Sequence, residues 1–475
     1  MRHVISCLLI VLAMLVQPFA LAATQLTDNP LNQADLPDYR VGTTGYLHLV
    51  WHDAVVDNGA ILFKLFNSAG TELITDIQIN DSSGSANTHP VTAIDASNRL
   101  FVVWQDQADQ EVWFMRLEPL LDDLDPATPA VLTTIKQTLA NNLDEVRISN
   151  PADGRPALNP AMAIDGSGNL HVVWESGAGG PVQYVQVDPD GNLMPGGPVS
   201  VSQAAGTGND LPDIAIDSAG HVHVVYTQPG ILTPADEIYY TMFDIDAVTG
   251  AVTVLIAPTR LTADDGLPAG NATVSVDLAD DRVYVVYKQA TTLVGNGDEQ
   301  VYLTALDPSL HNQPGLGADL AVIRLHETAI TATPAQNSWR VFSRIGSDRR
   351  VHAIYMDFDN TNCQIQAAPD YTIFNAHVTY DGKLITTETL TDTGAALTCN
   401  PQARLAPRSN RVVWTDNTTG NPEIFSTLFS RADSGSRGFT CSLRNPDAGV
   451  AQAGELWLLL AFMLLLWRLR TRRLR

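Results

Sequence analysis

The chain has 475 residues, 45% of them hydrophobic, and a formal net charge of −24 at pH 7. Because phosphate binding needs a basic face, this acidity excludes nucleic acid as a partner. The length allows several domains, but regular internal repetition favours one large repeat domain instead.

Residues 1–22 have the anatomy of a secretory signal peptide. A basic start precedes an apolar run from Val4 to Val16, and Ala20-Leu21-Ala22 forms a small-residue cleavage site. We therefore expect an exported protein. Cys7 lies inside the signal and no cysteine stands directly after the cleavage site, which argues against an amino-terminal lipid anchor.

The mature chain repeats one motif, a short β-branched or aliphatic run that ends in an aromatic residue. The clearest copy is His171-Val-Val-Trp174, and the motif recurs every 52 to 70 residues. Such runs are typical of buried strands. The closing aromatics are Trp51, Trp104, Trp174, Tyr226, Tyr287, Tyr355 and Trp414.

Each repeat contains four strand-like runs separated by turn residues. In the third repeat these are Ala161–Asp165, Leu170–Trp174, Gln183–Val187 and Val199–Ser202. Four short strands per repeat, with no helical pattern between copies, indicate a propeller blade. We predict an all-β fold, a seven-bladed β-propeller over residues 23–431.

The seventh repeat lacks a fourth strand. Its third strand, Glu423–Phe429, runs directly into a Ser-Gly linker. The amino-terminal stretch Thr24–Asp28 matches the outer-strand sequences Arg260–Asp264 and Thr389–Asp392. We therefore predict that the mature amino terminus supplies the outer strand of the last blade and closes the ring.

The repeat resembles the sialidase-like family of bacterial propeller repeats. The resemblance rests on Pro160-x-x-Ala-Ile-Asp165-x-x-Gly-Asn-Leu-His-Val-Val-Trp174, with Trp414-Thr-Asp416 and Glu423-Ile-Phe425, and it extends over roughly residues 24–430. It implies the propeller fold and a sialidase-like activity or binding function. The Ser-x-Asp-x-Gly-x-Thr-Trp box typical of true sialidases is absent from every repeat.

Two polar columns accompany the repeats. The histidines three places before the aromatic are His48, His171, His223 and His352. Positions on different blades are too far apart to ligate one ion, so we predict interblade packing and no metal.

The aspartates Asp95, Asp165, Asp217 and Asp277 follow the first strand, where carboxylates cap turns. Structural calcium is the alternative there, and we expect no other cofactor.

The ligand-binding hypothesis rests on a third column of residues. On the first strand, which lines the channel of a propeller, Arg40, Arg344 and Arg404 occupy positions where four other blades have small side chains. Blade seven needs a one-residue deletion for this alignment. Guanidinium forks suit carboxylate, sulfate or phosphate, and the column resembles the arginine triad of sialidases. The alternative is that each arginine pairs with a local acid such as Asp38, Asp348 or Asp392.

The sequence leaves three hypotheses about the function. The first is an exported, surface-tethered recognition module, expected to be a monomer, that binds an anionic ligand in the central channel. We expect this anionic ligand to be a glycan. The second is a sialidase-like glycoside hydrolase or lyase, for which Asp38 and Tyr39 are the nearest catalytic candidates. The third is a scaffold that binds only proteins.

Two cysteines fall in loops that a propeller presents on the same face. Cys363 lies in the second loop of blade six, and Cys399 lies in the connection to blade seven. Because exported proteins permit disulfides, we predict a Cys363–Cys399 bond.

The carboxy-terminal region has three parts. Residues 432–447 form a linker and a motif around Cys441, residues 448–467 are a hydrophobic segment that we expect to be helical, and residues 468–475 are an arginine-rich cytoplasmic tail. This order resembles the carboxy-terminal sorting signals of Gram-negative bacteria. We expect retention at the cell envelope or surface, by such sorting or by a permanent transmembrane anchor.

Overall fold

The structure is a computed structural model. It describes residues 24–28, 34–56, 59–81, 87–118, 136, 144–149, 154–177, 180–202, 210–229, 235–246, 248–263, 265–291, 299–312, 324–331, 337–346, 349–358, 371–379, 381–390, 404–405, 411–416 and 423–428. The predicted signal peptide and all three carboxy-terminal segments lie outside these residues. None of the helices within the described part of the chain is long and apolar enough to cross a membrane.

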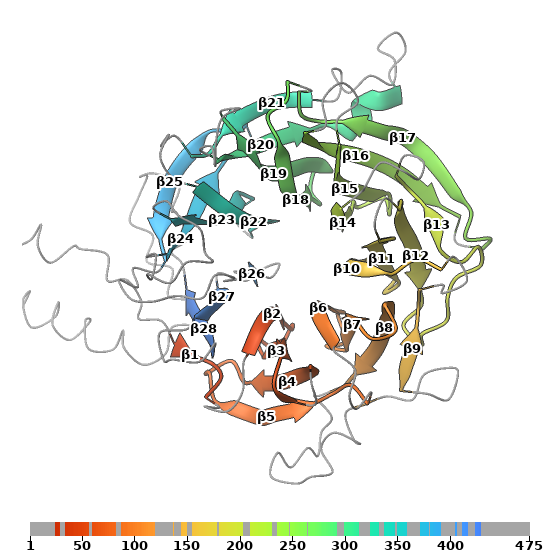
Figure 1. The fold of residues 1–475 in the computed structure, drawn as a ribbon, viewed down its shortest axis with the longest axis vertical. Coiled ribbons are helices and arrows are strands. Elements are labelled where there is room, and N and C mark those ends of the chain that lie inside the picture. Colours follow the sequence, from red (N-terminus) through yellow and green to blue (C-terminus); the bar gives the residue numbers. More distant parts are fainter. Residues whose placement is uncertain are drawn as a thin grey trace, which may run out of the picture.

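Seven four-stranded antiparallel sheets surround a central axis, as Figure 1 shows. From the axis outward, blade one is β2 (Ala34–Val41), β3 (Leu47–Asp53), β4 (Ala60–Phe66) and β5 (Glu72–Gln78); blade two is β6 (Asn87–Ile94), β7 (Leu100–Asp106), β8 (Glu111–Leu117) and β9 (Glu145–Arg147); blade three is β10 (Leu158–Ile164), β11 (Leu170–Glu175), β12 (Val182–Val187) and β13 (Val199–Ser200). Blade four is β14 (Asp210–Ile216), β15 (Val222–Pro229), β16 (Asp236–Ile245) and β17 (Val252–Arg260); blade five is β18 (Ala269–Asp277), β19 (Arg282–Ala290), β20 (Glu299–Leu306) and β21 (Arg324–Ala329), with a 3₁₀ turn at Pro308–Asn312. Blade six is β22 (Asn337–Ile345), β23 (Val351–Phe358), β24 (Tyr371–Val378) and β25 (Leu384–Thr389); blade seven is β26 (Arg404–Leu405), β27 (Arg411–Asp416), β28 (Glu423–Leu428) and β1 (Thr24–Gln25). The predicted seven-bladed propeller is confirmed.

Each closing aromatic packs against the preceding blade. Trp104 lies in one cluster with Val50 and Phe63 of blade one, and Trp414 lies with Ile354 of blade six. All seven aromatics are at most 5% exposed. A buried aromatic of this size dominates the energetics of its cluster, so the repeated aromatic joins neighbouring blades.

A second repeated contact fixes the outer strand of each blade. After the strand, an aliphatic residue donates its amide hydrogen to the third strand, as Leu261 does to the carbonyl of Ile238. The next residue, Thr262, accepts a hydrogen bond from the Ile238 amide and donates one to the buried Glu237 carboxylate. This pair of residues thus caps the blade edge.

The amino terminus makes the same contacts in blade seven. Leu26 donates to the Ile424 carbonyl at 2.7 Å, the Ile424 amide donates to the Thr27 hydroxyl at 2.8 Å, and that hydroxyl donates to Glu423. Thr24 and Gln25 pair with Ser426 and Phe425, so the first and last described strands share a sheet (Figure 1). The predicted ring closure is confirmed.

The inner strands carry a feature that the sequence pattern did not reveal. Blades one to six each have a register shift in the inner strand. In blades one to five a residue with φ between 46° and 52° lies at the shift: Leu36, His89, Asn159, Leu211 and Asn271. A non-glycine residue in this left-handed region marks a β-bulge, which here turns the strand end at the central axis.

Replacing Thr27 by valine tests the closure. The change leaves the buried Glu423 carboxylate without its hydroxyl donor and the Ile424 amide without its acceptor. We expect the free energy of unfolding to fall by about 2 kcal/mol, measured by urea denaturation. Thr24→Val, at an exposed position of β1, is the control and should change little. Equal stability of wild type and Thr27→Val would contradict closure by the amino terminus.

Candidate functional site: the central cavity

A cavity of about 160 Å³ lies on the propeller axis. Its lining comes from the inner strands of blades one to six, β2, β6, β10, β14, β18 and β22. Arg40 and Arg344, two of the three arginines in the predicted ligand column, both line it. Blades one and six therefore direct one guanidinium each into a common space.

Each of these arginines has a carboxylate partner. Arg40 Nη1 lies 3.0 Å from Asp38 Oδ1 and donates to the Tyr39 carbonyl at 2.7 Å. Arg344 Nη1 donates to the Ser343 carbonyl at 2.9 Å and lies 3.7 Å from Asp213 Oδ2 of blade four. Local pairing with Asp38, the alternative drawn from the sequence, is thus correct for Arg40. Arg344 reaches across the inner strand of blade five instead.

The two guanidiniums keep hydrogen-bonding capacity for a ligand. All the contacts given above are made by Nη1, and within the described part of the chain Nε and Nη2 of both residues have no partner. A guanidinium has five N–H donors in a planar fork. The Arg40 side chain is 12% exposed and that of Arg344 is 22% exposed, so the remaining donors are oriented by their ion pairs yet accessible.

The register of blade seven places Arg404 differently from Arg40. The backbone of Arg404 pairs with Val413, the residue before the closing Trp414. In blade one, the residue opposite the corresponding Val50 is Asp38, whereas Arg40 pairs with His48. Arg404 thus occupies the strand position of Asp38. The one-residue deletion used to align blade seven does not reproduce this register.

The bulges add polar residues that the sequence analysis missed. His89, Asn159 and Asn271 line the cavity from blades two, three and five. Their left-handed backbone places them at the bend of the inner strand, where Asn159 Nδ2 donates to Glu175 at 2.9 Å and the Asn159 backbone amide donates to Gln105 of blade two at 3.1 Å. A proline directly after His89 and Asn159 is the sequence signal that marks these bends.

Asp38 and Tyr39, the catalytic candidates, are held by the scaffold. Asp38 is 3% exposed, and its Oδ2 accepts hydrogen bonds from the amide and hydroxyl of Thr92 in blade two. Tyr39 is fully buried, and its hydroxyl donates to the Arg411 carbonyl in blade seven. Asp213 Oδ2 likewise accepts from the Val274 amide of blade five at 2.9 Å. These contacts brace adjacent blades.

The histidine column packs between strands and blades. His171 Nδ1 lies 2.8 Å from the Tyr184 hydroxyl, and its Nε2 lies 3.4 Å from Asp165. His223 repeats this arrangement with Tyr240 and Asp217. No group of three potential metal-ligating side chains occurs within the described residues.

The aspartate column caps turns, as predicted. Asp165 Oδ1 accepts hydrogen bonds from the amides of Ser167 and Asn169, and Asp95 and Asp217 cap their own turns in the same way. Burial alone would raise the pKa of Asp165, but the hydrogen bonds from His171 and Asn169 outweigh it and lower this pKa to about 2. The carboxylate is therefore ionised at neutral pH and serves the turn.

Other predicted residues lie outside the described part of the chain. These are Cys363 and Cys399, Cys441 of the tail motif, and the acids Asp348 and Asp392. The Cys363–Cys399 disulfide stays a prediction.

No family model and no curated protein matches the chain. Among solved structures, an ulvan lyase, a polysaccharide lyase bound to a GlcA(1-4)Rha3S saccharide, has a TM-score of 0.53 at 10% identity over 86% of this chain and 96% of that chain. A microbial sialidase gives 0.42 at 10% identity over 80% and 73%. A fucose-binding lectin from Aleuria aurantia gives 0.37 at 12% over 78% and 98%. The likeness to the lyase establishes the fold alone: the chain is a β-propeller.

His48 gives a test of the packing role. In blade one, Phe63 and Gly42 occupy the positions of Tyr184 and Asp165, the partners of His171 in blade three. Both ring nitrogens of His48 are therefore buried without a hydrogen bond among the described residues. Burial lowers the pKa of His48 to about 3. The folded protein keeps this ring neutral, whereas the unfolded chain protonates it below about pH 6.5. Stability is therefore lost as the pH falls from about 6.5 toward 3.

We expect His48→Phe to remove this acid sensitivity. Phenylalanine occupies the same position in blade two, where Phe101 stacks on Phe114. Between pH 7 and pH 5, wild type should lose about 2 kcal/mol more of its unfolding free energy than the variant does. Urea denaturation at both pH values measures this difference. Parallel losses in the two proteins would show that His48 is protonated or solvated in the fold.

Proposed function

We propose that the protein is a recognition module that binds an anionic glycan in its central cavity. The observation that carries the proposal is the convergence of Arg40 and Arg344 on one cavity, with hydrogen-bond donors left over after their ion pairs. Arginine forks bind carboxylate and sulfate through two parallel hydrogen bonds. The paired aspartates hold each fork in place, which lowers the entropic cost of binding.

The surrounding residues suit a saccharide. Asn271 offers an amide donor and an amide acceptor for hydroxyl groups, and Met162 adds an apolar surface to the lining. The ulvan lyase with the same fold is bound to a saccharide of glucuronate and sulfated rhamnose, which bears both kinds of anion. Acidic glycans that contain uronate or sulfate are therefore the ligand class we propose.

Binding without catalysis is favoured over glycoside hydrolysis. Glycoside hydrolysis needs two carboxyl groups free to act on the scissile bond. Both carboxylates of the cavity, Asp38 and Asp213, instead accept hydrogen bonds from amides of the next blade. The Tyr39 hydroxyl is likewise engaged with the backbone of blade seven.

Calorimetric titration of the full chain tests the proposal. We expect a sulfated glucuronate–rhamnose tetrasaccharide to bind, and the double variant Arg40→Gln, Arg344→Gln to bind it at least about tenfold more weakly, because each lost charged hydrogen bond contributes about 1.5–3 kcal/mol. Arg147→Ala, at an exposed position on the outer strand of blade two, is the control and should bind as wild type.

Two results would count against this function. Equal affinity of wild type and the double variant would exclude the cavity as the site. New reducing ends or unsaturated uronates in the incubated mixture would instead support the hydrolase or lyase alternative. Sialic acid and a sulfate-free uronate oligosaccharide extend the comparison to the other anionic sugars.

We also propose that the propeller is displayed at the cell surface of a Gram-negative bacterium. Support comes from the sequence: the signal-like residues 1–22 and the three-part tail after residue 431. A chain shortened to residues 1–431 should appear in the medium, while the full chain stays with the envelope fraction. Retention of the shortened chain in the envelope would contradict tethering through the tail. Immunoblots of both fractions measure the distribution.

A further inference from the structure

Of the five residues with a left-handed backbone at the inner-strand bulges, Leu211 of blade four is the most exposed. It lines the central cavity and is 37% exposed. Blade one has the same local sequence, Asp-Leu-Pro-Asp, yet its leucine, Leu36, is only 6% exposed. The position therefore does not itself require an exposed apolar side chain. Removing apolar surface from water favours folding, and Leu211 contributes little of this stabilisation.

The backbone of Leu211 is unfavourable as well. Its φ of 46° lies in the left-handed region, which disfavours leucine, whereas asparagine tolerates it. Blades three and five have Asn159 and Asn271 at the corresponding bulges, so the fold accepts the better suited residue there. Neither packing nor backbone conformation explains the leucine of blade four, which indicates a role toward a ligand.

The small size of the cavity places Leu211 and the cationic groups within reach of one sugar. Its volume of about 160 Å³ is near the ~150 Å³ of an engineered cavity that binds one benzene ring. A single sugar ring therefore fills most of the space and contacts several blades at once. Arg344 Nη1 lies 3.7 Å from Asp213, a residue two places after Leu211 in β14. A guanidinium and the exposed leucine thus meet at the inner strand of blade four.

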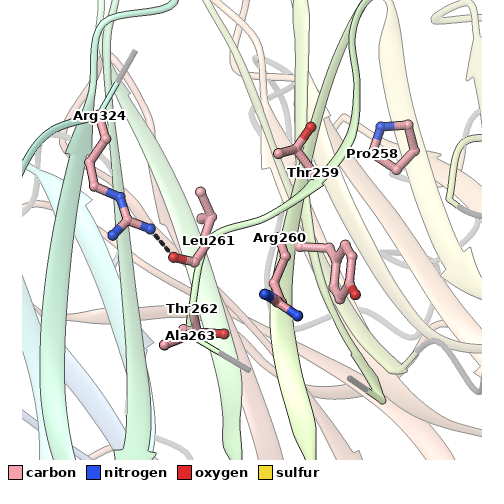
Figure 2. Close-up of a pocket in the computed structure, with 8 residues that line it drawn as sticks. Pro258, Thr259, Arg260, Leu261, Thr262, Ala263 and Arg324 are labelled. Atoms are coloured by element: carbon pink, nitrogen blue, oxygen red, sulfur yellow. Dashed lines mark hydrogen bonds between the residues drawn. The ribbon is translucent and has the colours of Figure 1, made fainter. Parts of the chain in front are cut away.

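A second cavity, at the outer junction of blades four and five, provides a comparison. It is also lined by a leucine and by arginine side chains, but Leu261 is only 1% exposed. Arg324 donates to the Leu261 carbonyl across the junction, as the dashed line in Figure 2 marks, and its Nη1 lies 3.6 Å from Glu327. Leu261 and Arg324 therefore serve the scaffold, whereas Leu211 presents its apolar side chain to the central cavity.

We infer that Leu211 makes the central cavity selective for a 6-deoxy sugar that bears an anionic group. The inference deepens the proposed function and rests on it for the class of ligand. Every ring carbon of a sugar carries an oxygen, so the methyl group of a 6-deoxy sugar is its one fully apolar substituent. Contact between this methyl group and Leu211 removes apolar surface from water on both partners, while the anionic group contacts Arg40 or Arg344.

The matching hexose is disfavoured at the same place. It has a hydroxymethyl group where the 6-deoxy sugar has a methyl group. This hydroxyl would lie against the apolar side chain of Leu211, which offers no hydrogen bond in place of the water that the hydroxyl loses. The leucine therefore selects between two sugars that differ by one oxygen atom.

Calorimetric titration of the full chain with two matched disaccharides tests the inference. One contains glucuronate and sulfated L-rhamnose, and the other has sulfated L-mannose in place of the rhamnose, which adds one hydroxyl group at the methyl carbon. We expect wild type to bind the rhamnose disaccharide about tenfold more tightly. Leu211→Asn should bind the two disaccharides equally. Leu211→Met, which keeps an apolar side chain of similar volume, should retain the preference.

Leu193→Asn is the matched control, because Leu193 is 39% exposed and does not line the cavity. It should keep the wild-type preference. Thermal unfolding should show Leu211→Asn to be at least as stable as wild type, since asparagine accepts the left-handed backbone.

An unchanged preference in Leu211→Asn, or equal binding of both disaccharides by wild type, would overturn the inference and leave the proposed function in place. A loss of affinity for both disaccharides by the same factor in Leu211→Asn would assign Leu211 a structural role and overturn the inference as well. Failure of wild type to bind either disaccharide would remove the proposed function itself.

Discussion

The structure depends on the packing of one aromatic residue per blade against the blade before it. Trp51 shows the consequence most clearly, because its cluster includes Val413 and Ile424 from the other end of the chain, together with Leu26. Burial of such a ring dominates each interface, and the seventh interface closes the circle. The rigid ring then fixes the inner strands around the axis, so residues from six blades line one small cavity.

The fold was predictable because its signals are local and repeated. The Val-Val-aromatic run identifies the second strand wherever it occurs, and the match of Thr24–Asp28 to other outer strands predicted the closure that Leu26 and Thr27 make. The bulges were not predictable from alternation, since Asn159 interrupts a strand that otherwise continues through it. A residue with a left-handed backbone conformation changes the direction of the strand without changing the apolar pattern of the sequence.

The candidate site was only partly predictable, because the sequence signals are local to one repeat. Counting back from the aromatic correctly placed Arg40 and Arg344 at the cavity, because both strands keep that spacing. It placed Arg404 two positions away from the register observed in blade seven. The pairing of Arg344 with Asp213 joins blades six and four, and no pattern within a single repeat encodes a contact that depends on the diameter of the ring.

The proposed function requires an acidic protein to bind an acidic ligand. Net charge acts over long distances and is screened by salt, whereas oriented guanidiniums act at contact. A crystal structure of the protein with a sulfated glucuronate–rhamnose disaccharide tests this account most directly. The account predicts a carboxylate or sulfate group within hydrogen-bonding distance of Nη2 or Nε of Arg40 or Arg344. A saccharide bound only away from the axis, or anionic groups directed away from both arginines, would contradict it.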